Sequence, residues 1–165
     1  MLALHPVAIL QLLILLTLAN GTPVIAKRIL GNVWSQPLDG GAVFLDGQPL
    51  FGTSKTIRGI VLSIAITSAF APFLGVDWSV GLAVAMTAMA GDLFSSFLKR
   101  RMKLPPSSRA IGLDQIPESL FPALACRSML GLSVIDIAAV VAIFFAGEAA
   151  LSRLLFKWGV RDRPF

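Results

Sequence analysis

The chain has 165 residues, of which 56% are hydrophobic and 14% are charged, and its mean hydropathy is +0.81. This composition excludes an ordinary soluble domain and is typical of a polytopic membrane protein. The formal net charge of +5 comes from basic residues in short segments beside apolar runs, which indicates membrane topology and argues against nucleic-acid binding.

The first apolar run extends from about residue 6 to residue 30 and is interrupted at Asn20, Gly21, Thr22 and Pro23. A helix needs about 20 residues to cross the hydrocarbon core, so the parts on both sides of this interruption are required. No lysine or arginine precedes the run, which argues against a cleaved signal peptide. We therefore expect a retained first helix with a break, whose freed backbone either lines a polar cavity or is satisfied by neighbouring helices.

Two further spans follow, over residues 57–76 and 78–98, and only a tight turn joins them. Beyond a basic loop at residues 99–113, the apolar segments 116–132 and 134–151 predict a fourth and a fifth helix. One long tilted helix with a re-entrant piece is the alternative for this last part. The predicted fold class is therefore all-α, with about five transmembrane helices in a single domain over residues 1–165.

Five crossings predict a consistent orientation in the cell membrane, with the N-terminus outside and the C-terminus cytoplasmic. All but one of the 14 basic residues then lie on one face, which the positive-inside rule makes cytoplasmic. The exception is Arg127, for which we expect Asp136 as a neutralising partner. The residues on the cytoplasmic face are Lys27, Arg28, Lys55, Arg58, Lys99, Arg100, Arg101, Lys103, Arg109, Arg153, Lys157, Arg161 and Arg163.

Asp92 is a carboxylate within the otherwise apolar third span. A charge at membrane depth is costly unless it is paired, hydrated or metal-bound, so Asp92 indicates a functional site. Asp92, Ser95, Ser96 and Lys99 stand at i, i+3, i+4 and i+7 and share one helix face. An acid, two hydroxyls and a cation on one face suit a metal ion and phosphate oxygens. For the cationic cluster that begins at Lys99, a purely topogenic role is the alternative.

Glycines, hydroxyls and cations are concentrated in the connection before the second span, where residues 52–59 read Gly-Thr-Ser-Lys-Thr-Ile-Arg-Gly. Glycines let a backbone approach a ligand closely, and hydroxyls and cations at a helix N-terminus bind phosphate. The segment is not a Walker A loop, because Ser54 and Pro49 occupy the glycine positions of that pattern and no strand precedes it. Ordinary turns with topogenic basic residues are the structural alternative.

Three motifs in this order resemble the CDP-archaeol synthase family. They are Asp46-Gly47-x4-Gly52-x2-Lys55-Thr56-x-Arg58-Gly59, Gly91-Asp92-x2-Ser95-Ser96-Phe97-x-Lys99-Arg100-Arg101, and Leu113-Asp114-Gln115. The early Asn20-x2-Pro23 fits as well, so the resemblance extends from about residue 20 to residue 122. The resemblance implies a five-helix membrane enzyme whose cytosolic loops form a nucleotide site. Such an enzyme joins the CMP part of CTP to a lipid phosphate and releases pyrophosphate with Mg²⁺.

The chemistry of this reaction asks for cations and carboxylates, because a lipid phosphate is already a dianionic nucleophile near neutral pH and needs no histidine or cysteine base. We expect Asp92, Lys55 and Lys99 to be the catalytic residues. The expected CTP- and phosphate-binding residues are Thr56, Arg58, Ser96, Arg100, Asn20 and Gly52. Mg²⁺ prefers one or two carboxylates plus phosphate oxygens, so the expected metal ligands are Asp92 and, as weaker candidates, Asp46 and Asp114.

The lipid substrate is the main alternative that the residues leave open. Gln48 stands where archaeal members of the family usually have an arginine, so an archaeol-type phosphate and phosphatidate are both retained as substrates. The later Lys-Asp and His-Gly-Gly elements of the larger CDP-diacylglycerol synthases are missing, and Pro105 and Pro106 occupy the place of the former. The expected partners are CTP, a lipid phosphate and the bilayer, without nucleic acid and with homo-oligomers left open.

Two other classes of membrane protein are alternatives to the enzyme. A small transporter or anion-binding membrane protein is supported by a broken helix with polar groups at depth, but the chain shows no internal repeat. A structural assembly protein, whose small residues only pack helices, would bind no CTP.

Overall fold

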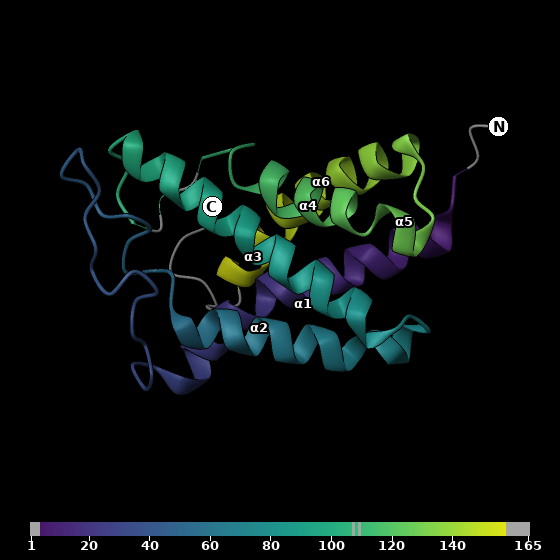
Figure 1. The fold of residues 1–165 in the computed structure, drawn as a ribbon, viewed down its shortest axis with the longest axis horizontal. Helices are drawn as coiled ribbons and strands as arrows, with labels where there is room; N and C mark the ends of the chain where they lie inside the picture. Colours follow the sequence, from purple (N-terminus) through teal and green to yellow (C-terminus); the bar gives the residue numbers. More distant parts are fainter. Residues whose placement is uncertain (1–3, 107, 109, 158–165) are drawn as a thin grey trace.

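A computed structural model describes residues 4–106, 108 and 110–157, and of residues 151–157 only the helical backbone (Figure 1). The helices are α1 (Pro6–Leu30), α2 (Ile57–Phe70), the 3₁₀ helix η1 (Ala71–Leu74), α3 (Trp78–Arg101), α4 (Gln115–Ala125), α5 (Arg127–Leu130) and α6 (Val134–Lys157). Within the described residues, extended structure is limited to two isolated bridges, Pro37 with Thr56 and Val43 with Pro49. The all-α fold class is confirmed.

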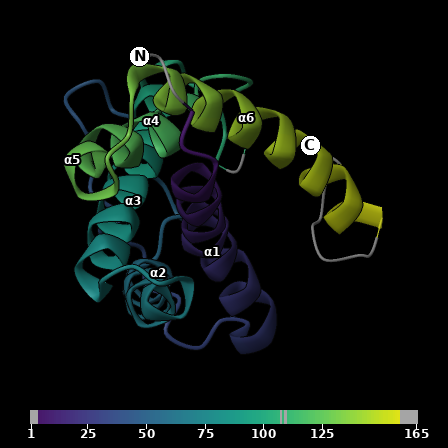
Figure 2. The same cartoon turned by 90° about the vertical axis from the view of Figure 1, so that its right-hand side faces the viewer.

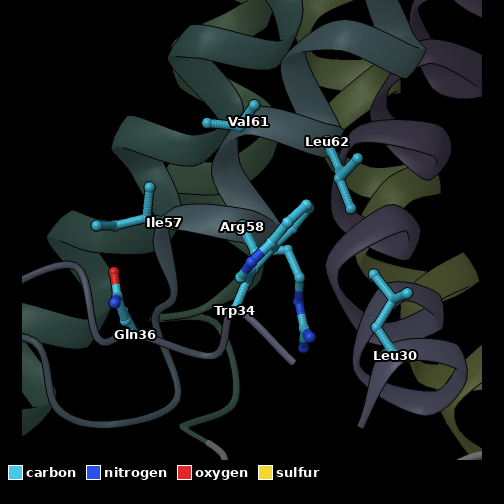
Figure 3. Close-up of a pocket in the computed structure, with 7 residues that line it drawn as sticks. All are labelled: Leu30, Trp34, Gln36, Ile57, Arg58, Val61 and Leu62. Carbon is cyan, nitrogen blue, oxygen red and sulfur yellow. The ribbon is translucent and has the colours of Figure 1, made fainter. Parts of the chain in front are cut away.

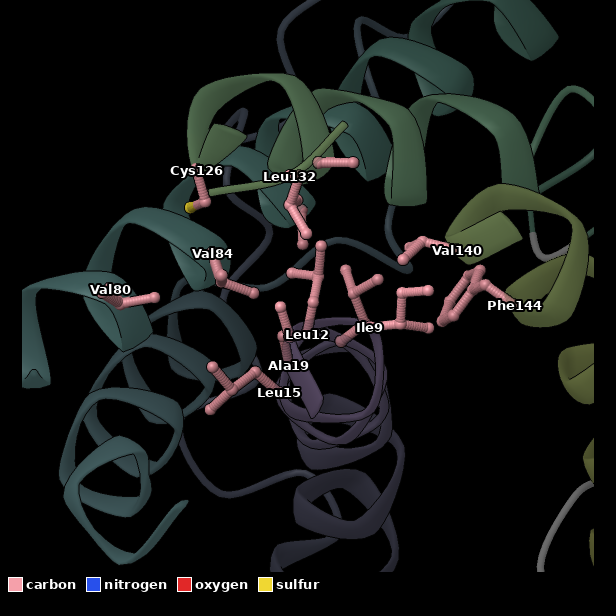
Figure 4. Packing of buried hydrophobic residues seen from close by; sticks show 14 of the residues in the cluster. Ile9, Leu12, Leu15, Ala19, Val80, Val84, Cys126, Leu132, Val140 and Phe144 are labelled. Carbon is pink, nitrogen blue, oxygen red and sulfur yellow. The ribbon is translucent and has the colours of Figure 1, made fainter. Parts of the chain in front are cut away.

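The helices alternate in direction, so both long loops lie at one end of the molecule and the start of α1 lies at the other end (Figure 1). In Figure 2, α2, α3 and α4 lie on one side of α1, while α6 begins beside α4 and then diverges from the bundle. The core is centred on Leu12 and Leu15 of α1, with Val84 of α3 and Val140 of α6 packed around them (Figure 4). Apolar burial therefore joins the N-terminal helix to α3 and α6.

Three described helical segments are long and apolar enough to cross a membrane: Pro6–Leu30, Ile57–Leu74 and Trp78–Arg101. These segments confirm the first three predicted spans. The predicted fourth span, 116–132, is wrong as one helix, because α4 has only 11 residues and is about 16 Å long. The alternative of a short piece followed by one long helix fits α4 and the 24-residue α6 better. The count of five crossings stays a prediction.

The predicted break in the first helix is wrong, because α1 continues through Asn20 and Pro23. Pro23 has no N–H, so the carbonyl oxygen of Ala19 loses its usual helical donor. The Ser63 hydroxyl of α2 donates to this oxygen at 2.8 Å and is fully buried. The freed carbonyl is thus satisfied by the neighbouring helix, which was one of the two expectations for this position.

The predicted pairing of Arg127 with Asp136 is also wrong. Asp136 accepts hydrogen bonds from the backbone N–H groups of His5 at 2.9 Å and Ser133 at 2.8 Å, and it lies 2.7 Å from Nδ1 of His5. Ser133 Oγ accepts in return from the backbone N–H of Asp136 at 3.2 Å, so the two residues form a capping box at the start of α6. Arg127 is exposed and donates to the carbonyl of Leu132.

Some of the predicted cytoplasmic basic residues fall beyond this description. Arg109, Arg161 and Arg163 lie outside the described residues, as do the side chains of Arg153 and Lys157.

Candidate active site

The centre of the site is an ion pair between α3 and the loop that precedes α2. Lys55 Nζ lies 2.5 Å from both carboxylate oxygens of Asp92, and each side chain is only 21% exposed. Burial alone would lower the pKa of Lys55, but the Asp92 carboxylate outweighs this effect and raises that pKa above its ordinary value. The intramembrane carboxylate therefore has a charged partner from a segment 37 residues away.

Local structure around α2 holds Lys55 in this position. The N–H of Leu38 donates to the carbonyl of Lys55 at 2.7 Å, and the N–H of Ile57 donates to Gln36 at 3.2 Å. Thr56 then caps α2, because its hydroxyl oxygen accepts from the N–H of Gly59 at 3.2 Å. A short two-stranded contact and a helix cap thus hold the backbone on both sides of the lysine.

A second ion pair lies two turns further along α3. Lys99 Nζ lies 2.7 Å from Asp114 and also donates to the carbonyl of Ser108 at 3.0 Å. The other carboxylate oxygen of Asp114 accepts from the N–H of Ala110 at 3.0 Å, so the side chain orders the loop before α4 and does not cap that helix. Lys99 also attracts Asp92 electrostatically, which makes the two pairs one charged group.

Glu118 of α4 is a site residue that lies outside the three sequence motifs. Its side chain is buried, with 6% of the residue exposed, and it shares a hydrogen bond with Asp92. The close approach of α3 and α4 explains this position. A Cβ on Gly91 would lie 2.4 Å from the carbonyl oxygen of Pro117, so only glycine allows the two backbones to meet here.

We call these five residues the Asp92 cluster: Asp92, Lys55, Lys99, Asp114 and Glu118. Its three carboxyl groups and two ammonium groups interact across three segments of the chain. Ser95 and Ser96 are buried on the same face of α3, as the helical spacing predicted, and Ser95 donates to the backbone of Asp92 at 2.9 Å. Buried cations, carboxylates and hydroxyls at one place suit a polyphosphate and a divalent cation.

Beside the cluster, Arg100 presents an incompletely paired guanidinium to the glycine-rich loop. One terminal nitrogen donates to the carbonyl of Pro105 at 2.8 Å, while the buried Nε and Nη1 have no partner. A Cβ on Gly52 would lie 3.7 Å from Nη1, and Gly52 has a φ of +91°, which favours glycine. Unpaired buried donors next to a close backbone approach are a feature expected of a phosphate subsite.

Asp39 organises this loop through contacts with residues up to 13 positions away. Its carboxylate accepts from the N–H groups of Gly41 at 3.0 Å, Phe51 at 2.9 Å and Gly52 at 3.0 Å. Burial opposes the charged form, but these donors outweigh it and lower the pKa of Asp39 below its ordinary value. The carboxylate therefore holds Gly52 against Arg100.

Other predicted site residues are held elsewhere. Asp46 pairs with Arg101 at 2.6 Å, and this guanidinium also lies over the rings of Phe44 and Phe97. No group of three or more histidine, cysteine or acidic residues that suits a metal ion is found among the described residues, so Asp46, Asp92 and Asp114 do not form one ligand set. Each of these three acids instead pairs with a different cation.

Asn20 and Arg58 also make their contacts outside the Asp92 cluster. The amide nitrogen of Asn20 donates to the carbonyl of Leu16 on its own helix at 3.1 Å. Arg58 donates to the carbonyls of Gly31 and Val33, beyond the end of α1. Arg58 therefore connects α2 to α1, and no ion pair joins it to a carboxylate in the part of the chain that the structure describes.

Known proteins are similar to this chain both in sequence and in the arrangement of helices. The family model described as CarS-like, CDP-archaeol synthase, matches residues 70–164. A CDP-archaeol synthase of Sulfurisphaera tokodaii is 30% identical over 153 residues, which cover 89% of each chain. The chain belongs to the CDP-archaeol synthase family. The CDP-archaeol synthase of Pyrobaculum aerophilum is 31% identical over 152 residues, 89% of this chain and 91% of the relative.

A solved structure supports the same assignment at the level of the fold. It is that of an intramembrane enzyme for archaeal membrane lipid biosynthesis, with a TM-score of 0.67 and 29% identity, over 84% of this chain and 90% of the other. The family resemblance inferred from the three motifs is confirmed. The chain is a membrane protein and a nucleotidyltransferase of the CTP-dependent cytidylyltransferase class.

Proposed function

We propose that this chain transfers CMP from CTP to an archaeol-type lipid phosphate at the Asp92 cluster, giving a CDP-activated lipid and pyrophosphate. The observation that carries the proposal is the ion pair of Lys55 with Asp92, which joins the first two family motifs in a buried site. Curated relatives that match most of the chain are named CDP-archaeol synthase, which supports the ether lipid over phosphatidate.

The reaction needs charge neutralisation more than proton transfer. An oxygen of the lipid phosphate attacks the α-phosphorus of CTP, the new P–O bond forms, and the bond to the β-phosphate breaks to release pyrophosphate. The attacking phosphate has its second pKa near 6 and is therefore mostly dianionic at neutral pH. The barrier comes from bringing this anion onto a polyphosphate, and fixed cations lower it.

Three cations of the site serve the phosphates in this proposal. Lys55 and Lys99 are each held by a carboxylate before the nucleotide binds, and Arg100 has unpaired buried nitrogens that face Gly52. We assign Lys55 and Lys99 to the reacting phosphates and Arg100, with Ser96, to the remaining phosphate oxygens. Thr56 keeps its helix cap while its hydroxyl hydrogen stays available to an oxygen acceptor.

Mg²⁺ fits the two neighbouring carboxyl groups of Asp92 and Glu118. Their proximity is unfavourable when both are charged, and the two lysines of the Asp92 cluster face three carboxyl groups. A divalent cation held by Asp92 and Glu118, with Asp114 as the weaker candidate, would offset this excess and neutralise charge on the nucleotide phosphates. Asp92 would then hold Lys55 less tightly, which would leave this lysine available to a phosphate.

The test is pyrophosphate release by the purified full-length protein with CTP, Mg²⁺ and either an archaeol-type phosphate or phosphatidate. We expect release with the ether lipid and a loss of at least about 100-fold in Asp92→Asn. Asp77→Asn is the matched control, because Asp77 caps α3 at its opposite end and asparagine caps as well. Unchanged turnover in Asp92→Asn would remove this carboxylate from the mechanism, and faster turnover with phosphatidate would overturn the choice of lipid.

A further inference from the structure

A groove outside the Asp92 cluster separates the end of α1 from the start of α2. Its volume is about 330 Å³. Besides Arg58 and the polar Gln36, its walls are apolar: Leu30 of α1, Trp34 of the following turn, and Ile57, Val61 and Leu62 of α2. In Figure 3 these side chains surround the Arg58 side chain, and Leu30 faces α2 across the groove. The groove is therefore an apolar channel with one cationic side chain in its wall.

Arg58 is unusual because it is buried and, among the residues that the structure describes, no carboxylate pairs with it. Only 7% of the residue is exposed, and its terminal nitrogens donate to the carbonyls of Gly31 and Val33. Its Nε is buried and has no hydrogen-bond partner. Neutral carbonyls do not cancel the positive charge, so an anion in the groove would satisfy both the charge and the unpaired donor.

The level of the groove in the molecule favours a lipid as its occupant. It lies between the last turn of α1, which contains Lys27 and Arg28, and the first turn of α2, where two membrane-spanning segments end. Trp34 is 79% exposed at its rim, and tryptophan is enriched at the membrane–water interface. Val61 and Ile57 are also exposed, so the apolar wall continues onto the lipid-facing surface.

The polar end of the groove is near the reacting groups. Arg58 stands three positions after Lys55, so their Cα atoms are at most about 11 Å apart. Arg58 also lies in the first turn of α2, where the positive end of the helix dipole favours an anion. A phosphate that enters beside Arg58 is thus within reach of the Lys55 and Asp92 pair.

We propose that this α1–α2 groove docks the lipid phosphate substrate, with Arg58 facing the phosphate and Leu30, Val61 and Leu62 contacting the first methylene groups of its chains. The inference rests on the proposed function, because it names the entry site of the lipid for that reaction. It assigns to Arg58 a lipid-binding role separate from the CTP site, where the sequence interpretation had placed this residue.

Binding can be measured without catalysis through the fluorescence of Trp34. The sequence contains two other tryptophans, so Trp78→Phe and Trp158→Phe together leave Trp34 as the single emitter. The full chain in phosphatidylcholine vesicles is titrated with a lipid phosphate whose chains are brominated near the headgroup. We expect stronger quenching of Trp34 by this probe than by brominated phosphatidylcholine at the same mole fraction. Equal quenching by both lipids would overturn a phosphate-selective groove.

The KM for the lipid phosphate is the second measurement. Leu62→Trp fills the groove, and we expect the KM for the lipid phosphate to rise about tenfold, equivalent to about 1.4 kcal/mol, with the KM for CTP unchanged. Met86→Trp places the same indole on the exposed surface of α3 and serves as the control. Equal lipid KM values in Leu62→Trp and the wild type would overturn the docking site while the proposed reaction stands. If no lipid phosphate is turned over, the proposed reaction is wrong. The quenching of Trp34 then still tests whether the groove binds the lipid phosphate.

Discussion

Ser63 donates a hydrogen bond of 2.8 Å to the carbonyl oxygen of Ala19, the group that Pro23 deprives of its helical donor. Inside a bilayer no water can donate to such a carbonyl, so the Ser63 hydroxyl on α2 supplies the hydrogen bond that α1 lacks. The same contact keeps α1 and α2 in register close to the loop that holds Lys55. A proline in a spanning helix is therefore compatible with a straight, ordered core.

Replacement of this hydroxyl is the first test. We expect Ser63→Ala to lower the free energy of unfolding by about 1 kcal/mol, because the buried carbonyl is left unsatisfied. Ser68→Ala, on the same helix, is the control, since the buried Oγ of Ser68 has no partner. Thermal unfolding in detergent measures both variants. Equal melting temperatures for the two variants would show that Ala19 finds another donor.

A second test concerns the crossing of α3 and α4. Gly91→Ala puts a Cβ 2.4 Å from the carbonyl oxygen of Pro117, so the helices must separate and Glu118 must move away from Asp92. We expect a loss of both stability and CTP-dependent turnover. Gly21→Ala is the matched control, because no atom lies within 4 Å of its added Cβ and alanine favours a helix by about 1 kcal/mol. A fully active Gly91→Ala would contradict the close packing of these helices.

The third test replaces Glu118 and distinguishes a structural role of this acid from a role as a metal ligand. We expect Glu118→Gln to fold normally, since glutamine keeps nearly the same shape and can still donate a hydrogen bond to Asp92. Its turnover should fall about 10- to 100-fold, and the Mg²⁺ concentration for half-maximal rate should rise. Steady-state rates at varied Mg²⁺ measure both effects. A normal Mg²⁺ dependence with reduced turnover would assign Glu118 to positioning rather than to the metal.

A fourth test uses the pKa of Asp39, which three backbone donors hold below the ordinary value of 3.8. A carboxyl group with a lowered pKa in the folded loop stabilises that loop above the ordinary value. The stabilisation is lost as the pH falls through the lower, folded value. We expect pepsin to cut the loop between residues 39 and 52 only at the acid end of a series from about pH 5 to about pH 2. Asp39→Asn should be cut throughout the series, and a pH-independent wild-type pattern would contradict the anchoring role.

The sequence by itself determined much of the outline. Because apolar length and the helical period are local properties, residues 6–30, 57–74 and 78–101 were placed as helices close to their observed bounds. The cost of a charge in an apolar helix pointed to Asp92, and the order of the three motifs indicated the family that the relatives confirm.

Only the tertiary structure decided which charges meet. Local spacing cannot show that Asp92 pairs with Lys55 and shares a hydrogen bond with Glu118. Nor can it show that Asp46 pairs with Arg101. Those contacts depend on how closely helices cross and where a loop is anchored. One glycine against the backbone of Pro117 brings Glu118 into the site, and the geometry of two packed helices turns Arg58 towards α1. The sequence thus identified most of the charged residues of the site, and long-range packing determined which of them pair.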